Sequence, residues 1–289
     1  MRRRRNGGGL IIGLSTSNMM SVGLPGISGA PVTTHYAYVA NSGSNTVSVI
    51  EISTNKVITT IAVESQSKPV WVAITPDGNY AYVTNFTGSI STVSVIEIST
   101  NKVITTIGVG TNPDGVAITP DGNYAYVVSY GTYDVSVIEI STNKVITTIG
   151  VGVHPDGIAI TPDGSYAYVA NTATNGSVSV IQISTNTVVA TISVGSEPVW
   201  VAITPDGNYA YVTNYNSGTV SVIEISTNTV TATVTVEKNP DGVAITPDGN
   251  YAYVTNYGSN TVSVIEISTN KVVATISVGT EPEGIAITP

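Results

Sequence analysis

Carboxylates and tryptophans recur at one position of a repeated segment, just before a short apolar run such as Val-Ala-Ile-Thr-Pro. An acidic residue follows a proline in four of these segments, and a tryptophan stands two residues after the proline in the other two. Carboxylate oxygens are the ligands that Ca²⁺ prefers, and an indole face can stack on a sugar or an organic cation. The candidate ligand residues are Trp71, Asp114, Asp156, Trp200, Asp241 and Glu283.

The same residues also have a structural interpretation, which the sequence favours. Asp-Gly after proline is ordinary turn chemistry, and a tryptophan beside a valine at the start of a strand fills space between packed sheets. We therefore expect no cofactor, with Ca²⁺ kept as an alternative.

Catalytic chemistry is difficult to build from the remaining residues. The chain has no cysteine, which excludes disulfides, thiolate zinc sites and cysteine nucleophiles. Its two histidines are His35 and His154, and His154 occupies a loop position that other repeats fill with Lys, Asn or Glu. An active site needs one repeat that differs from the others, and the repeats differ mainly in their loops. The sequence predicts a protein that is not an enzyme.

A repeat of four strand-like segments must position these residues. The tyrosine that opens each Tyr-Ala-Tyr-Val segment stands at Tyr36, Tyr80, Tyr124, Tyr166, Tyr209 and Tyr251, with spacings of 44, 44, 42, 43 and 42 residues. Each unit contains four short β-branched or aromatic segments separated by Pro-Asp-Gly-Asn, a Gly/Ser/Asn loop and Ser-Thr-Asn. This pattern predicts an all-β, six-bladed β-propeller with four antiparallel strands per blade.

One tetrapeptide within the repeat is specific enough to indicate a family. Tyr-Val-Thr-Asn occurs at 82–85, 211–214 and 253–256, each time after Thr-Pro-Asp-Gly-Asn-Tyr-Ala. The chain therefore resembles the YVTN family of β-propeller repeats over about residues 36–289. That resemblance implies an extracytoplasmic protein similar to archaeal surface-layer and bacterial extracytoplasmic propellers. Surface-layer relatives are commonly seven-bladed, whereas six units are counted here.

The last copy of the apolar run, residues 284–289, is not followed by the second strand of its repeat. The entry to the first strand varies with a period of three blades, and Tyr-Ala-Tyr-Val-Ala-Asn occurs only at 36–41 and 166–171. We therefore expect residues 284–289 to form the innermost strand of the blade built from residues 36–61. This pairing would close the ring, either within one molecule or with a neighbour.

The two faces of the predicted propeller differ in sequence. One face carries near-constant turns whose aspartates, such as Asp77 and Asp121, are expected to be structural. The other face carries the variable loops, where recognition usually resides. Two glycosylation sequons lie in these loops, at Asn85 and Asn175.

Charge is distributed unevenly along the chain. All four arginines lie at positions 2–5, and the rest of the chain has six lysines against nineteen acidic residues, or 6 − 19 = −13. Nucleic-acid binding depends largely on Lys and Arg, so a nucleic-acid partner is not expected.

Residues 1–34 belong to no predicted blade and form a separate tail, with the propeller spanning 35–289. The basic start, the weakly apolar stretch and the small residues near 28–30 resemble a secretory signal. No apolar run is long enough for a transmembrane helix.

The sequence favours an extracellular or cell-surface interaction or assembly module, such as a subunit of a surface layer, sheath or filament. Its expected partners are other proteins or further copies of itself, with glycans as a further candidate. The alternative is a small-molecule or metal-binding propeller, with lactonase-like chemistry at the mouth of the channel.

Overall fold

The computed structural model describes residues 12–17, 34–64, 67–86 and 91–287. Within these ranges every regular element is a strand, and the strands form six four-stranded antiparallel sheets. Val, Ile, Thr and Tyr fill the strands because their side chains pack well on a pleated surface. The predictions of an all-β fold and of four strands per repeat are confirmed.

The strands are numbered along the chain, four to a sheet. Sheet 1 contains β1 (Ile12–Ser17), β2 (Thr34–Asn41), β3 (Thr46–Glu51) and β4 (Lys56–Ala62); sheet 2 contains β5 (Pro69–Ile74), β6 (Tyr80–Phe86), β7 (Ser91–Glu97) and β8 (Lys102–Gly108). Sheet 3 contains β9 (Pro113–Ile118), β10 (Tyr124–Ser129), β11 (Asp134–Glu139) and β12 (Lys144–Gly150); sheet 4 contains β13 (Pro155–Ile160), β14 (Tyr166–Asn171), β15 (Ser177–Gln182) and β16 (Thr187–Ser193). Sheet 5 contains β17 (Pro198–Ile203), β18 (Tyr209–Asn214), β19 (Thr219–Glu224) and β20 (Thr229–Thr235); sheet 6 contains β21 (Pro240–Ile245), β22 (Tyr251–Asn256), β23 (Thr261–Glu266) and β24 (Lys271–Ser277).

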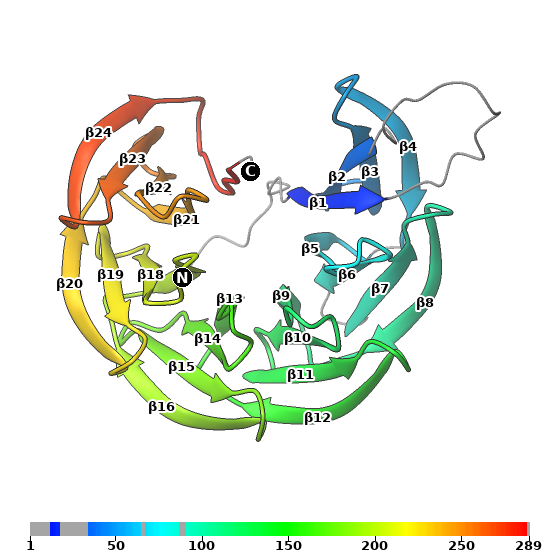
Figure 1. Ribbon diagram of the computed structural model, residues 1–289, viewed down its shortest axis with the longest axis horizontal. Coiled ribbons are helices and arrows are strands. Elements are labelled where there is room, and N and C mark those ends of the chain that lie inside the picture. Colours follow the sequence, from blue (N-terminus) through cyan, green and yellow to red (C-terminus); the bar gives the residue numbers. More distant parts are fainter. Residues whose placement is uncertain (1–11, 18–33, 65–66, 87–90, 288–289) are drawn as a thin grey trace, which may run out of the picture.

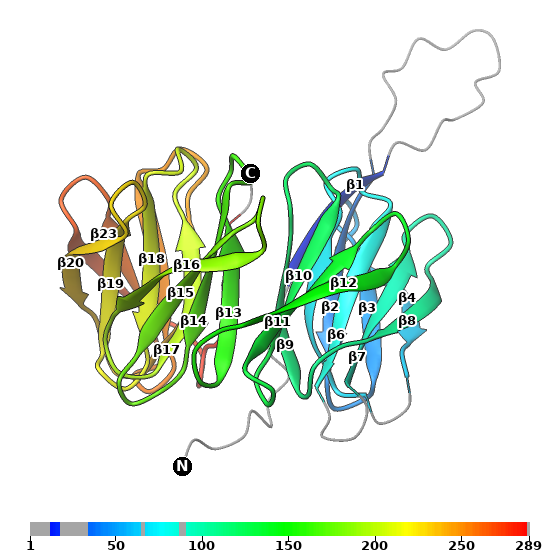
Figure 2. The ribbon, with the colours of Figure 1, turned by 90° about the horizontal axis from the view of Figure 1, so that it is seen from below.

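The sheets follow one another around a central axis, with the first strand of each sheet innermost and the fourth outermost (Figure 1). The inner strands run along this axis, so that the hairpin connections fall at two opposite ends (Figure 2). We call the end with the Pro-Asp-Gly turns the turn face, and the end with the second-to-third and fourth-to-first connections the loop face. The arrangement is that of a β-propeller, and the ring is open between sheet 6 and sheet 1 (Figure 1).

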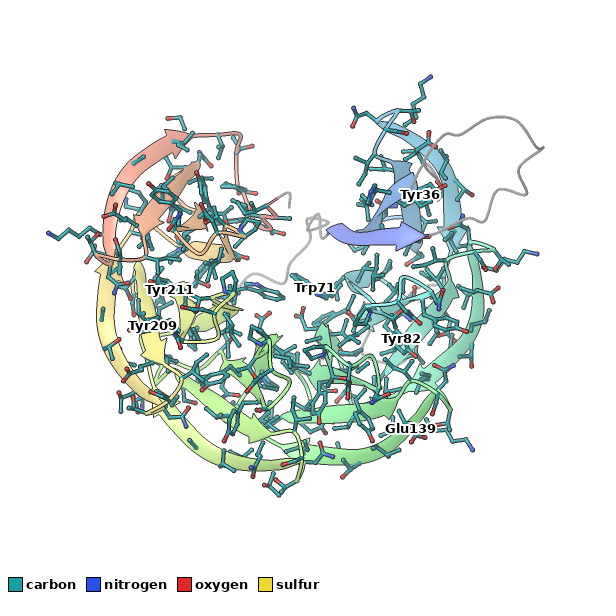
Figure 3. All side chains as sticks on the ribbon, in the orientation of Figure 1. Tyr36, Trp71, Tyr82, Glu139, Tyr209 and Tyr211 are labelled. Atoms are coloured by element: carbon teal, nitrogen blue, oxygen red, sulfur yellow. The ribbon has the colours of Figure 1, made fainter. Side chains whose placement is uncertain are left out.

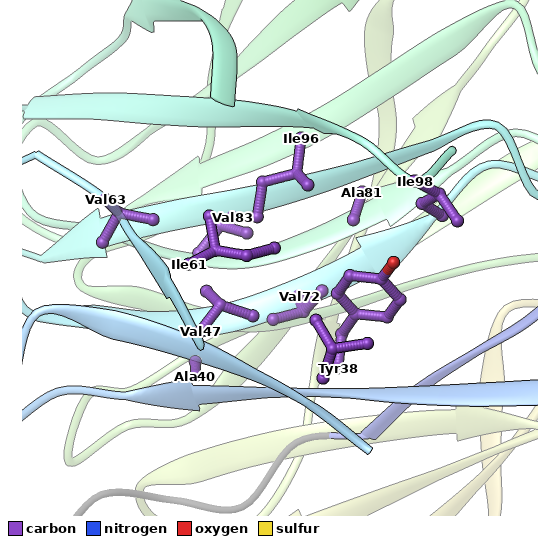
Figure 4. Close-up of a cluster of buried hydrophobic side chains, with 11 residues drawn as sticks. Tyr38, Ala40, Val47, Ile61, Val63, Val72, Ala81, Val83, Ile96 and Ile98 are labelled. Atoms are coloured by element: carbon purple, nitrogen blue, oxygen red, sulfur yellow. The ribbon is translucent and has the colours of Figure 1, made fainter. Parts of the chain in front are cut away.

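Apolar side chains of consecutive sheets form the core between them. Between sheets 1 and 2, Tyr38, Val47 and Ile61 pack against Val72 and Ile96, and all five are buried (Figure 4). Full burial of one Val or Ile side chain contributes about 1.5–3 kcal/mol. Because each sheet covers the next in this way, the packing fixes the position of each sheet relative to its neighbour.

One hydrogen bond recurs at every junction between consecutive sheets. The hydroxyl of Tyr38 in β2 donates to Oδ1 of Asn101, in the turn before β8, over 2.8 Å. Burial raises the pKa of these tyrosines above the usual value, to about 12 for Tyr126, Tyr168 and Tyr211. The other four bonds join Tyr82 to Asn143, Tyr126 to Asn186, Tyr168 to Asn228 and Tyr211 to Asn270.

The turns of the turn face are built from their own side chains. In sheet 3 the Thr119 hydroxyl donates to Oδ1 of Asp121 over 2.5 Å, and the backbone N–H of Asn123 donates to the same oxygen over 3.0 Å. These two bonds lower the pKa of Asp121 below its usual value. Gly122 has a φ of 73°, a left-handed conformation that glycine adopts without strain. The structural interpretation of these aspartates therefore fits their contacts.

The edge of β2 differs from the sequence expectation. Residues 284–289 were expected to pair beside residues 36–41, but β1 occupies this edge, with Ile12 opposite Val39. Residues 282–287 form no strand. Ile12-Gly13-Leu14 has the same apolar, small, apolar order as 285–287. β1 is also close to β2 in the sequence, whereas residues 285–287 are far from it, so pairing with β1 costs less closure entropy. β1 lies within the segment 1–34 that the sequence assigned to no blade.

The two sheets that border the opening lack a covering neighbour. Ile276 of sheet 6 is 45% exposed, whereas the matching Ile61 of sheet 1 is 6% exposed. Tyr253 of sheet 6 is only half-buried, and Asn55 of sheet 1 is exposed. Tyr253 and Asn55 hold the positions that the tyrosine–asparagine bond uses at the five junctions.

Replacing a junction tyrosine tests whether the ring is open in solution. Tyr126→Phe should lower the free energy of unfolding by about 1 kcal/mol, because Asn186 loses its hydrogen-bond donor. Tyr253→Phe, the matched control at the opening, should change it little. Urea denaturation measures both, and equal losses would show that Tyr253 has a partner and that the ring is closed.

The same tyrosines predict a loss of stability at alkaline pH. A folded-state pKa of about 12 for Tyr126, Tyr168 and Tyr211 favours the neutral hydroxyl. Their contribution is therefore complete below the unfolded value of about 10 and is lost as pH rises toward 12. Melting temperatures and the ultraviolet absorbance of tyrosinate, followed together, should show a late ionising group of tyrosines. A single transition near the unfolded value would contradict this assignment.

Candidate functional site

The two tryptophans of the predicted site meet inside the ring. Trp71 lies on β5 and Trp200 on β17, and their ring centroids are 3.9 Å apart at an interplanar angle of 33°. Trp71 points toward the centre of the ring (Figure 3). A Cβ atom on Gly157 of β13 would lie 2.7 Å from the Trp200 ring, so glycine is required there for close approach. The two rings pack on each other, which leaves less of each face for a ligand.

The four acidic candidates lie at the start of innermost strands or, for Glu283, at the corresponding position after β24. Asp114, Asp156 and Asp241 are buried, and Glu283 is half-buried. The main-chain oxygen of Asp114 accepts the Thr84 hydroxyl over 2.6 Å, which ties this strand to the preceding sheet. Within the described ranges, no three His, Asp or Glu residues gather closely enough to hold a metal ion. A Ca²⁺ site at these residues stays a prediction.

The two glycosylation candidates have different surroundings. The Asn85 side chain is buried, and its Nδ2 atom donates to Thr92 Oγ1 over 3.0 Å and to Ser94 Oγ over 2.9 Å. A glycan on this nitrogen would break both bonds, so this placement argues against Asn85 as an acceptor. Asn175 is exposed on the loop face.

The position of Asn85 identifies sheet 3 as different from its neighbours. At this position four other sheets carry an asparagine that bonds to two hydroxyls of the third strand, whereas sheet 3 carries Ser129. The hydroxyl of Ser129 and Oδ1 of Asp134 are buried without a hydrogen-bond partner among the described residues. The loop 129–134 is thus built differently from its counterparts.

This loop carries an aromatic group on the loop face. The rings of Tyr130 and His154 stack with centroids 4.6 Å apart, and Tyr133 meets His154 edge to face at 5.0 Å. The Tyr133 hydroxyl and His154 Nε2 are hydrogen-bonded over 3.1 Å. Phe86 of sheet 2 lies 6.4 Å from Tyr130, centroid to centroid. We call Tyr130, Tyr133 and His154 the aromatic platform; it joins sheets 3 and 4.

The backbone of Tyr133 is in an unfavourable conformation for a tyrosine. Its φ is 61°, in the left-handed region that costs a non-glycine residue about 1–2 kcal/mol. Sheets 1, 5 and 6 use residues suited to this conformation at the equivalent position: Asn45, Gly218 and Asn260. Tyr133 is also 39% exposed, so burial does not compensate for the strain. Such backbone strain at an exposed tyrosine makes Tyr133 a candidate functional position.

The sequence contains a signal for this platform in the loop of sheet 3 and in the residue at position 154. Ser-Tyr-Gly-Thr-Tyr-Asp at 129–134 lacks the asparagine that begins the corresponding loops, and His154 stands where other repeats have Lys, Asn or Glu. His154 lies in the loop before β13, as expected, and its contacts are aromatic. Among the residues that the structure describes, no helix is long and apolar enough to cross a membrane.

Comparisons with known proteins agree on the propeller architecture. A family model described as "Choice-of-anchor I domain" matches residues 133–283, and one described as "Lactonase, 7-bladed beta-propeller" matches residues 32–149. The described residues form six sheets, one fewer than the second description states. A search of curated protein sequences found no match.

Solved structures with the same fold include two propellers of low sequence identity. Kuenenia stuttgartiensis hydrazine synthase is 24% identical with a TM-score of 0.80, covering 96% of this chain and 88% of that one. A functionally unknown protein from Desulfotomaculum acetoxidans is 22% identical with a TM-score of 0.74, covering 94% and 87%. At this identity the likeness concerns the fold alone.

The strain at Tyr133 predicts a stabilising substitution. Tyr133→Asn introduces the residue that sheets 1 and 6 use at this φ, and should raise the free energy of unfolding by up to about 1 kcal/mol. Asn260→Tyr, the reverse change in sheet 6, should lower it by at least as much, because the hydrogen bond from the Glu281 N–H to Asn260 Oδ1 is lost as well. Thermal and urea unfolding measure both, and a destabilised Tyr133→Asn variant would show that the aromatic contacts outweigh the strain.

Proposed function

The chain belongs to the choice-of-anchor I domain family, and we propose that it is a non-enzymatic extracellular or cell-surface module that assembles with other proteins or with copies of itself. A subunit of a surface layer, sheath or filament fits this role. The observation that carries the proposal is the difference between the two faces of the propeller. The turn face repeats one Thr–Asp turn in sheets 2 to 6, whereas the connections on the loop face differ in sequence from sheet to sheet.

The constant turn face supports a scaffold role for the strands. The Thr–Asp bond of the turn recurs in sheets 2 to 6 with distances of 2.5–2.6 Å. Loops that vary on such a constant framework are where recognition usually lies. The description of the family refers to an anchor, which supports association with a surface. The resemblance to YVTN repeats, known from surface-layer proteins, supports the same role.

Charge limits the class of partner. With a net charge of −9 and every arginine at positions 2–5, the propeller itself is acidic. Attraction to polyanions such as nucleic acids is therefore unfavourable. Contacts between copies can instead pair the basic start of one chain with the acidic body of another. Such exposed attractions weaken as salt screens them.

A second candidate function is ligand binding with lactonase-like chemistry at the centre of the ring. The match of residues 32–149 to the lactonase propeller model favours it. The contact between Trp71 and Trp200 and the burial of Asp114 and Asp156 leave little accessible chemistry there. Incubation with a panel of lactones, and with Ca²⁺ added or removed, tests this candidate through hydrolysis and melting temperature.

Light scattering on the full chain tests the assembly function. Species larger than a monomer are expected at low salt, with partial dissociation at high salt. Asn216→Arg on the loop face should change the size distribution, whereas Ser226→Arg on the turn face, equal in added charge and also exposed, should not. A monomer under every condition would refute assembly through this face.

A further inference from the structure

The aromatic platform has the shape and chemistry of a binding surface. Tyr130 and His154 stack face to face, and Tyr133 stands across the His154 ring at 85°, which forms a corner between two ring planes. The hydrogen bond between the Tyr133 hydroxyl and His154 Nε2 fixes this corner. Because Tyr133 is exposed and its backbone is held in the left-handed region, its ring is presented to solvent at a conformational cost.

The surroundings of the platform favour a cation. Ring faces carry negative potential and attract guanidinium or ammonium groups, and arginine also stacks on aromatic planes. Asp134 follows Tyr133 directly, and the loops 109–113, 129–134 and 151–155 contain no Lys or Arg. An arginine side chain would therefore find aromatic faces, with no lysine or arginine in these loops to compete.

The arginines of this protein lie in one segment outside the described residues, at positions 2–5. The position of β1, which follows this segment in the chain, shows where the described part of the chain begins. Ile12 of β1 pairs with Val39, near the end of β2 that leads into the loop face. Ile12, the first described residue of the chain, therefore lies at the loop-face end of sheet 1, and the platform lies on the same face.

We propose that the aromatic platform binds the arginine side chains of residues 2–5 of a second copy of the chain. Two copies with their loop faces together, related by a twofold axis, bring the basic segment of each toward the platform of the other, so that one contact is made twice. This inference rests on the proposed assembly function and names its contact. The strain at Tyr133 is then the cost of presenting a ring for stacking.

A peptide titration tests the platform separately from assembly. The probe is a synthetic peptide of residues 1–11, and its partner is the full chain carrying Arg2→Gln, Arg3→Gln, Arg4→Gln and Arg5→Gln, so that no internal segment competes. The peptide should bind in calorimetry, and an analogue with glutamine at the four arginine positions should bind about tenfold more weakly or not at all.

Substitutions in the same protein locate the binding. Tyr133→Asn, which suits the backbone at this position, should weaken peptide binding about tenfold. Tyr257→Asn, in the Tyr215–Tyr257 pair on the loops of sheets 5 and 6, is the matched control and should not change it. High salt should weaken the interaction without abolishing it, because stacking persists when charges are screened. Binding that Tyr133→Asn leaves unchanged would overturn the proposal.

Size measurements on the unmodified chain separate the possible failures. Assemblies that Tyr133→Asn dissociates, together with peptide binding, support the proposal. Assemblies without any peptide binding overturn this inference and leave the proposed assembly function standing. A monomeric unmodified chain whose arginine-to-glutamine variant binds the peptide shows that each platform holds its own segment, which overturns the second copy as occupant.

Discussion

Each sheet of this propeller has one face that only the next sheet can cover, and the whole structure follows from that requirement. The face of each sheet that points toward the next sheet carries Tyr, Val and Ile. If this face stayed in water, the sheet would lose the free energy gained by burying it. The hydroxyl of the junction tyrosine adds a direction to this packing, because it reaches a single asparagine in the turn of the following sheet. Repetition of one apolar contact and one hydrogen bond sets the angle between all consecutive sheets.

The same requirement explains the opening of the ring. The last sheet presents Ile276, Val278 and Tyr253 at the position where another sheet would pack, and the first sheet presents Ile52 and Asn55. The backbone edge of β2 is nevertheless paired, because β1 supplies the missing strand. The pairing of a strand edge and the covering of a sheet face are thus separate requirements. At sheet 1 the edge of β2 is paired, but the outward face of the sheet stays uncovered.

The aromatic platform on the loop face is made by residues that depart from the repeat. Where the repeat uses asparagine to bond two hydroxyls, sheet 3 has Ser129, and the freed loop presents two tyrosines toward His154. The residues at the centre of the ring belong to the repeat, since Trp71 and Trp200 pack on each other and the aspartates are buried at strand starts. Strain and exposure therefore coincide on the loop face, while the centre of the ring is built for packing.

The sequence by itself determined the strands, their number per sheet and the chemistry of the turns, because these depend on residues within one repeat. Pro-Asp-Gly with a preceding threonine specifies its own hydrogen bonds, and alternating β-branched residues specify a strand. Only the tertiary structure decided which segment pairs with β2, because Ile12-Gly13-Leu14 and residues 285–287 carry the same apolar pattern and register depends on which one is brought near. It also decided that Trp71 meets Trp200 and that Tyr130, Tyr133 and His154 form one group. Those residues are separated by many positions in the chain, and their distances are set by the packing of whole sheets.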